Sequence, residues 1–118
     1  MGLPKESRLR HRKDFDSVFA RSRAWSDPLL VLRTLPNDLD HNRYGFVTSK
    51  RIGGAVVRNK ARRRLREIVR KMDAKQGYDV VLSAKTTTPS ATFDELREAV
   101  LRLLARSGLA EPRTEASS

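Results

Sequence analysis

Cationic side chains are concentrated in one 22-residue segment of this 118-residue sequence. Residues 50–71 contain ten Lys and Arg residues and a single acid, Glu67. Arginine supplies a planar fork of N–H donors that fits phosphate oxygens and stacks on nucleobases. A helix that is merely solvated usually interleaves both signs of charge. The segment therefore predicts a surface that binds a polyanion, and a solvated charged face is the weaker alternative.

Few other residues are placed for catalysis or metal binding. The sequence has no Cys, which excludes a disulfide framework, a Cys-ligated zinc site and a thiol nucleophile. Neither His11 nor His41 has a second ligand at metal-binding spacing, and the acids form no cluster typical of a nuclease. No phosphate-cradling Gly-rich motif or dinucleotide fingerprint occurs. We therefore expect no catalytic residue and no metal site built from protein side chains alone.

The apolar positions of the basic segment predict a helix over residues 55–72, which contain no Pro or Gly. At about 100° per residue, six apolar side chains share one arc: Val57, Ala61, Leu65, Ile68, Val69 and Met72. The opposite side carries a polar set, with Arg58 at its border: Asn59, Arg62, Arg63, Arg66 and Arg70. One face is therefore expected to pack on a sheet while the other presents arginines.

Two further helices are predicted on either side of this segment. Apolar residues at helical spacing predict a short helix over residues 12–21. A capping-box pattern from Thr92 to Glu95 opens a last helix, and Gly108 is expected to end it.

Strands are predicted for residues 29–35, 44–48 and 79–84, with Trp25 as a possible extension of the first. Turn residues between the first two predict that they pair as a hairpin. The order α-β-β-α-β-α, with a helix between two strands of one sheet, predicts an α+β fold with a mixed β-sheet. We expect residues 1–108 to form a single domain and residues 109–118 to be a disordered tail.

The overall charge narrows the class of partner. Lys and Arg total 25 against 14 Asp and Glu, which gives a net charge of +11. A small basic domain of this kind most often binds nucleic acid. No stretch approaches the roughly 20 apolar residues of a membrane span, and residues 1–9 lack the apolar core of a secretory signal. We expect a cytoplasmic protein.

Residues 50–67, KRIGGAVVRNKARRRLRE, closely resemble the signature of the bacterial ribonuclease P protein subunit. That signature has the form K-x-I-G-x-A-V-x-R-N-x-x-K/R-R-x-x-R. The resemblance extends to the first helix, to the strand before the motif and to the last strand and helix. The chain departs from the family pattern at Lys60, where Arg is usual, and at Arg33, where an aromatic residue is common.

This resemblance implies an endoribonuclease subunit that is not catalytic on its own. The ribonuclease P ribonucleoprotein removes the 5′ leader from precursor tRNA by Mg²⁺-dependent phosphodiester hydrolysis, and the RNA subunit carries the chemistry and binds most of the Mg²⁺. The protein is implied to bind the catalytic RNA and the leader, and to be monomeric without RNA. A left-handed crossover around the basic helix is also implied, although a right-handed one is usual.

The resemblance also implies two sets of site residues. The set that binds the RNA subunit lies in the basic helix and the loop before it: Lys50, Arg51, Arg58, Asn59, Lys60, Arg62, Arg63, Arg66 and Arg70. The set that binds the 5′ leader lines a cleft between the first helix and the sheet: Phe15, Phe19, Val31 and Arg33. By spacing alone the two phenylalanines fit a core better, but a ring can pack by an edge and stack on a base by a face.

Two other functions fit the composition. A ribosomal-type structural RNA-binding protein would be similarly basic but would need no apolar cleft for a single strand. A DNA-binding protein would place the helix over residues 55–72 in a major groove. Its arginine-rich face carries one Asn and no Gln or Thr, which makes it poor at reading base edges.

Overall fold

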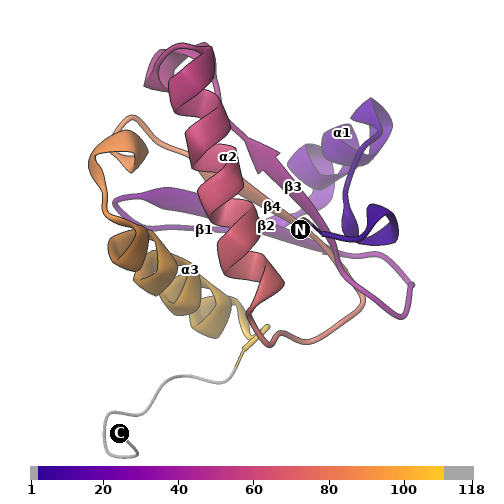
Figure 1. The fold of residues 1–118 in the computed structure, drawn as a ribbon. Coiled ribbons are helices and arrows are strands. Elements are labelled where there is room, and N and C mark those ends of the chain that lie inside the picture. Colours follow the sequence, from indigo (N-terminus) through magenta and orange to yellow (C-terminus); the bar gives the residue numbers. More distant parts are fainter. Residues whose placement is uncertain (1–2, 111–118) are drawn as a thin grey trace, which may run out of the picture.

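Four strands form one mixed sheet in the computed structural model, which describes residues 3–110 (Figure 1). In chain order they are β1 (Arg23–Ser26), β2 (Leu30–Pro36), β3 (Arg43–Val47) and β4 (Tyr78–Ala84). Their order across the sheet is β1-β2-β4-β3. β4 pairs antiparallel with β2 and parallel with β3. The expected α+β class and mixed sheet are confirmed.

The predicted hairpin between the strands at 29–35 and 44–48 is wrong, because β4 lies between β2 and β3. The side chains of β4 explain its central place. Asp79, Val80, Val81 and Leu82 are buried in succession, so the strand is covered on both faces. α2 connects the parallel neighbouring strands β3 and β4 as a crossover. The left-handedness of this crossover stays a prediction.

β1 is a separate strand and not an extension of β2. The carboxylate of Asp27 accepts hydrogen bonds from the backbone N–H groups of Leu29 and Leu30, at 2.8 and 2.9 Å. This local bonding turns the chain back on itself. Trp25 consequently lies opposite Leu32 in an antiparallel pair.

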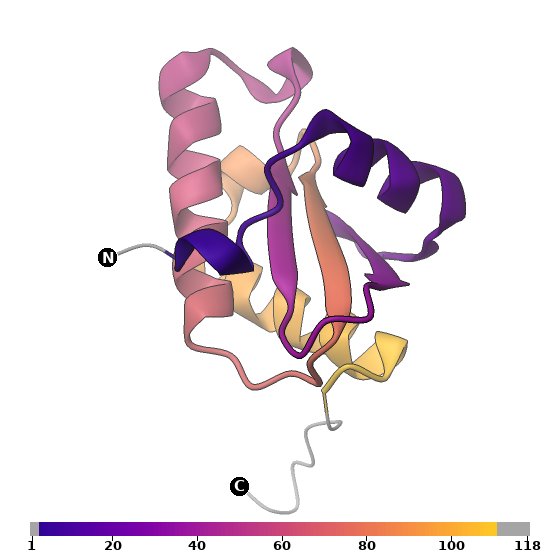
Figure 2. The same ribbon diagram turned by 90° about the vertical axis from the view of Figure 1, so that its right-hand side faces the viewer.

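The helices cover both faces of the sheet, as Figure 2 shows. α2 (Ala55–Arg70) and α3 (Phe93–Ser107) pack on one face, where Leu30 and Leu32 of β2 join the larger core. α1 (Arg12–Arg21) packs on the other face, above a smaller core of Leu9, Val18 and Val81. Short 3₁₀ turns occur at Lys5–Ser7, Lys50–Ile52 and Thr88–Ser90. In residues 3–110, no helix is long and apolar enough to cross a membrane.

Both ends of α3 follow the sequence prediction, but the ordered chain continues past it. The Thr92 hydroxyl accepts from the Glu95 N–H at 3.1 Å, and the Glu95 carboxylate accepts from the Thr92 N–H at 2.8 Å. Gly108 ends the helix with φ of 83°. The next residue, Leu109, bonds back to the Leu104 carbonyl and is only 3% exposed.

The predicted tail over residues 109–118 therefore begins too early. The backbone pattern after Gly108 is a Schellman motif, which returns the residue after the glycine to the helix's apolar side. Leu109 thus belongs to the larger core, and Ala110 packs against it. Residues 111–118 lie outside the described part of the chain.

Candidate nucleic-acid interface

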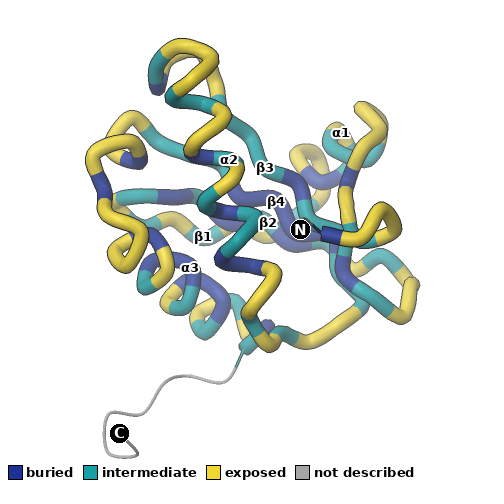
Figure 3. The backbone as a smooth tube through the Cα atoms, viewed as in Figure 1, coloured by how far each residue is buried: buried dark blue, intermediate teal, exposed yellow. Residues whose placement is uncertain are grey.

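α2 is held by one face and open on the other. Ala61, Leu65, Ile68 and Val69 are buried, as their spacing predicts, and the last three join the larger core with the sheet and α3. Val57 is half-buried, and Met72 packs on the core although the helix ends at Arg70. The burial pattern in Figure 3 follows the same division along α2.

The predicted RNA-subunit set lies on this open face and on the turn before it, except that Arg58 lies at the border, where its Nε is buried with no hydrogen-bond partner among the described residues. Six of its members are exposed: Lys50, Arg51, Asn59, Lys60, Arg63 and Arg70. The other three are half-buried: Arg58, Arg62 and Arg66. The structure therefore brings the predicted cations together on one surface, which we call the α2 face and define by these nine residues.

The residues of the α2 face are not all equally free to bind an anion. Arg70 forms a two-contact pair with Glu67, at 2.7 and 3.3 Å, and Lys71 approaches the same carboxylate at 3.2 Å. These cations hold the pKa of Glu67 below its usual value, with the Arg70 hydrogen bond as the largest cause. The one acid of the basic segment thus offsets charge at the C-terminal end of α2. The uncompensated charge lies further toward the N-terminus.

Arg62 is fixed by two neighbours. Its guanidinium donates to the Thr48 hydroxyl, which follows β3, and to the side-chain oxygen of Asn59 one turn earlier. Asn59 thus holds Arg62 with its oxygen and keeps its amide N–H groups for other partners. Sequence reasoning missed Thr48, because nothing in the spacing shows that a residue before the motif reaches the helix.

The turn before α2 is built around a glycine. Gly53 has a φ of 145°, and a Cβ there would meet Val57 at 2.9 Å. Ile52 is buried beside it, while Lys50 and Arg51 point outward. The turn therefore anchors the chain with one apolar side chain and exposes its cations next to the start of α2.

The predicted leader-binding residues gather on the opposite face of the sheet, around α1. Phe15 is half-buried against the smaller core, and its ring lies so close to Gly45 that a Cβ there would come within 2.5 Å. Phe19 is 46% exposed, one turn further along α1. Phe15 therefore packs mainly as core and Phe19 offers exposed surface, and the stacking of bases on either ring stays a prediction.

Val31 and Arg33 of β2 lie on the same side as α1. Val31 pairs with Ser83 across the sheet and Arg33 pairs with Val81. The Arg33 guanidinium carbon is 4.8 Å from the centroid of the Phe19 ring, so the two side chains stack. Arg33 also donates to the Ser83 hydroxyl at 3.5 Å. We call Phe19, Val31, Arg33 and Ser83 the α1–sheet surface.

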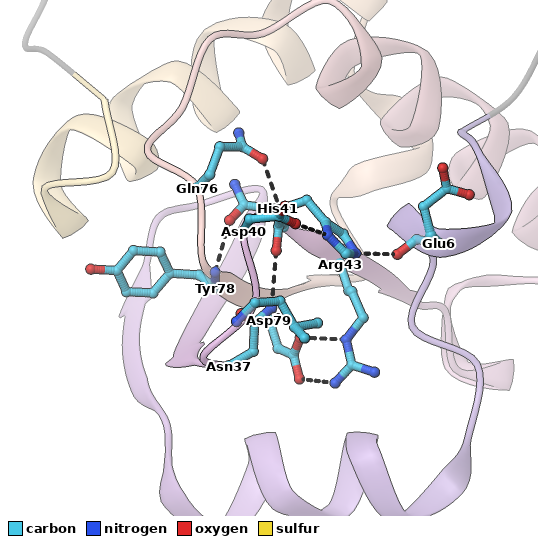
Figure 4. A network of polar contacts seen from close by, with 10 residues as sticks. Glu6, Asn37, Asp40, His41, Arg43, Gln76, Tyr78 and Asp79 are labelled. Carbon is cyan, nitrogen blue, oxygen red and sulfur yellow. Dashed lines mark hydrogen bonds and ion pairs between the residues drawn. The ribbon is translucent and has the colours of Figure 1, made fainter.

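A buried carboxylate fixes α1 against the sheet. Asp79, only 5% exposed, accepts from Arg43 Nε at 2.8 Å and from Arg43 Nη2 at 2.7 Å. The third nitrogen of Arg43 lies 3.5 Å from the Asp14 carboxylate at the start of α1. Figure 4 shows the two Arg43–Asp79 contacts and the Asn37 amide that donates to the same carboxylate. This network sets the position of α1, and no spacing in the sequence predicts it.

His41 joins the N-terminal turn to the loop before β3. Its Nδ1 is 2.9 Å from the Asp40 carboxylate, and its Nε2 is 2.9 Å from the Glu6 carbonyl (Figure 4). Both partners are acceptors, so only the doubly protonated ring donates to both. The Asp40 hydrogen bond is the main cause that raises the pKa of His41 above its usual value.

The described residues offer little for direct metal binding. Within residues 3–110, no group of three or more His, Cys, Asp or Glu side chains is placed to hold a metal ion. The arrangement therefore has two features of chemical interest. One is a cationic helix face, and the other is an aromatic–arginine stack on the opposite side of the sheet.

Comparisons with known proteins agree with the resemblance in the sequence. The family model described as Ribonuclease P matches residues 3–108. The ribonuclease P protein component of Dehalococcoides mccartyi strain CBDB1 is 36% identical over 116 residues, which cover 98% of this chain and 97% of that protein. The component from Syntrophomonas wolfei is 34% identical, with 91% and 92% covered.

Solved structures give the same result for the fold. The ribonuclease P protein of Thermotoga maritima is similar with a TM-score of 0.78 and 31% identity, over 84% of this chain and 96% of that one. A Staphylococcus aureus ribonuclease P protein mutant with defective mRNA degradation activity is similar with a TM-score of 0.83. It is 26% identical, and the match covers 90% of this chain and 92% of that one.

Proposed function

Because this chain belongs to the ribonuclease P protein family, we propose that two surfaces on opposite faces of its sheet divide the work of an RNA-binding subunit. The family is the protein component of a ribonucleoprotein endoribonuclease that processes tRNA. A ribosomal-type structural role and a DNA-binding role therefore lose their support. What remains to be assigned is which surface meets which RNA.

The α2 face is proposed to bind the backbone of the catalytic RNA. Its support is a concentration of cations for which, within residues 3–110, Glu67 near the C-terminal end of α2 is the one acid in an ion pair. Thr48 and Asn59 hold Arg62 in place before any RNA arrives, which lowers the entropy lost on binding. Each cation that meets a phosphate releases counterions, so this contact is expected to weaken steeply as salt rises.

The α1–sheet surface is proposed to bind the single-stranded 5′ leader of precursor tRNA. Its support is the exposed Phe19 ring beside Arg33, because single strands bind where aromatic faces adjoin positive charge. Val31 adds a half-buried apolar contact next to this stack. Arg43, which pairs with Asp79 in the sheet, also contacts Asp14 at the start of α1 and so ties α1 to the sheet beside this surface.

The chemistry is proposed to belong to the RNA subunit. Mg²⁺, held mainly by that RNA, would activate the attacking water and stabilise the leaving oxygen. The protein residues would lower the repulsion between the catalytic RNA and the precursor tRNA by placing positive charge between them. We also infer that the protein is monomeric without RNA and acts in the cytoplasm, as the family resemblance implies.

The observation that carries this division is the placement of the α2 face and the Phe19–Arg33 stack on opposite sides of one sheet. The test measures the affinity of the reconstituted holoenzyme for tRNA with and without a 5′ leader. Wild-type holoenzyme is expected to prefer the leader-bearing RNA, and Phe19→Leu is expected to reduce that preference. Equal affinity of the wild-type holoenzyme for both RNAs would refute the assignment of the leader.

A further inference from the structure

We propose that Arg33 binds a phosphate of the leader, so that this side chain recognises the charge of the RNA backbone. The inference rests on the proposed leader-binding function of the α1–sheet surface. It deepens that function by naming the chemical group that one side chain recognises. It also makes Arg33 a determinant of how binding depends on salt and on leader sequence.

The strand register places Arg33 on the leader side of the sheet. Its neighbours across the sheet are Ala24 of β1 and Val81 of β4. Ala24 is small and exposed, and Val81 is fully buried, so neither carries charge or covers the guanidinium with a long side chain. Among these cross-strand neighbours, Arg33 is therefore the charged side chain.

The contact with Phe19 restrains the Arg33 guanidinium. The Arg33 carbon lies over the ring at 4.8 Å from its centroid, which favours the cation electrostatically. The five N–H donors of a guanidinium lie in its plane, at its edge. A planar fork held in one orientation is the geometry that fits two phosphate oxygens.

Residues 3–110 use few of the N–H donors of Arg33. A guanidinium carries five N–H donors, and the structure assigns one long bond of 3.5 Å, to the Ser83 hydroxyl. Among residues 3–110, no carboxylate forms an ion pair with Arg33. The contrast with Arg43 is clear, because two carboxylates surround that side chain.

A phosphate fits this environment better than a base does. Phe19 already covers one face of the guanidinium, and the edge donors still need an acceptor. A base stacked on the outer face would leave those donors unpaired, whereas a phosphate would satisfy at least two of them and the charge as well. Stacking of a base on Arg33 is the competing outcome that the test must separate.

The experiment is a scan of the leader with single methylphosphonate linkages, each of which removes one phosphate charge. Holoenzyme affinity is measured for wild type, Arg33→Leu and Arg23→Leu. Arg23 is a matched control, because it also stacks on an aromatic ring, Trp25, at 5.2 Å. Its register partner is Thr34, whose side chain is buried on the α2–α3 side of the sheet. Arg23 therefore lies on that same side, away from the face that carries Arg33.

We expect one linkage at which the neutral analogue weakens wild-type binding about tenfold, as for a charge-assisted contact. At that linkage Arg33→Leu binds charged and neutral leaders equally, and Arg23→Leu behaves as wild type does. The slope of log K against log salt falls by about 0.7 in Arg33→Leu. Arg33→Lys keeps most of the slope, because it keeps the charge.

The result that overturns the proposal is a linkage profile that Arg33→Leu leaves unchanged. A second overturning result comes from leaders with single abasic positions: if removal of one base, and not of one charge, cancels the effect of Arg33→Leu, the guanidinium stacks on a base. Thermal melts of each variant show whether it is folded. Failure of the leader-binding function itself would be visible separately, as a wild-type holoenzyme that does not distinguish leader-bearing from leaderless tRNA.

Discussion

Gly45→Ala tests the packing that positions α1. A Cβ at residue 45 would lie 2.5 and 2.6 Å from two carbons of the Phe15 ring and 3.3 Å from Leu9 Cβ. Carbon atoms pack at roughly 3.5–4.0 Å, so the ring must retreat by about 1 Å. The backbone of residue 45 has no positive φ, so the strain comes from the side chain alone.

The expected cost follows from two opposing terms. Overpacking a core by one methyl group typically costs about 1–3 kcal/mol. Replacing a strand glycine with alanine recovers about 0.5–1 kcal/mol of backbone entropy. We therefore expect Gly45→Ala to lower the free energy of unfolding by about 1–2 kcal/mol, measured by urea denaturation.

The double-mutant cycle with Phe15→Leu makes this prediction specific. The smaller side chain leaves room for the new methyl group, so the cost of Gly45→Ala should shrink in the Phe15→Leu background. Binding of leader-bearing tRNA should weaken in Gly45→Ala and recover in the double variant, because the position of α1 is what changes. Additive free energies, or no loss of stability in Gly45→Ala, would refute the reasoning.

Three further predictions concern charge. The folded-state pKa of His41 is raised, so its contribution to stability is fully present below the unfolded value of 6.5 and is lost as pH rises through the folded value. The difference in urea midpoint between wild type and His41→Gln should therefore be larger at pH 5.5 than at pH 8.5. Sulfate should raise the thermal midpoint more than a neutral osmolyte that is equally excluded from the protein surface, since anions that bind the α2 face stabilise the fold by mass action. Equal shifts of the midpoint would argue against bound anions. Thr48→Val should weaken binding to the catalytic RNA by about 0.5–1.5 kcal/mol in filter-binding titrations, because Arg62 loses one of its two supports, whereas Thr48→Ser should bind as wild type does.

The helices were predictable because their information is local. Six apolar residues recur at helical spacing over residues 57–72, five of them lie in α2, and four of those are buried as expected. The Thr92–Glu95 capping box likewise depends on residues three apart, and the structure contains both of its hydrogen bonds. Local spacing also placed Arg62, Arg63, Arg66 and Arg70 on the side of α2 away from its buried residues.

The order of the strands was not predictable from the same kind of signal. β4 follows β3 by about thirty residues and inserts between β2 and β3, so the pairing depends on which apolar strand best fills the centre. The turn residues at 36–40 are compatible with a hairpin, yet they connect two strands that never pair. The contacts of Asp79 with Arg43 and of Ser83 with Arg33 follow from this insertion, and no sequence spacing predicts them.

The candidate site shows the same contrast. The family resemblance named Phe19 and Arg33 for one surface, and the structure brings these two side chains into direct contact. The supporting residues Thr48, Asp79 and Ser83 were missed, because each acts on a side chain that is distant in sequence. Contact of either surface with RNA stays a prediction.

The salt dependence of affinity for the catalytic RNA tests the division between the two surfaces most directly. One titration series compares wild type, Arg66→Ala and Phe19→Ala from low to high salt, with thermal melts to show that each is folded. The account predicts that Arg66→Ala lowers the slope of log K against log salt by about 0.7–0.9, the loss of one phosphate contact. Phe19→Ala should leave both the slope and the affinity for this RNA unchanged. An unaltered slope in Arg66→Ala, or an equal loss of affinity in Phe19→Ala, would contradict the account.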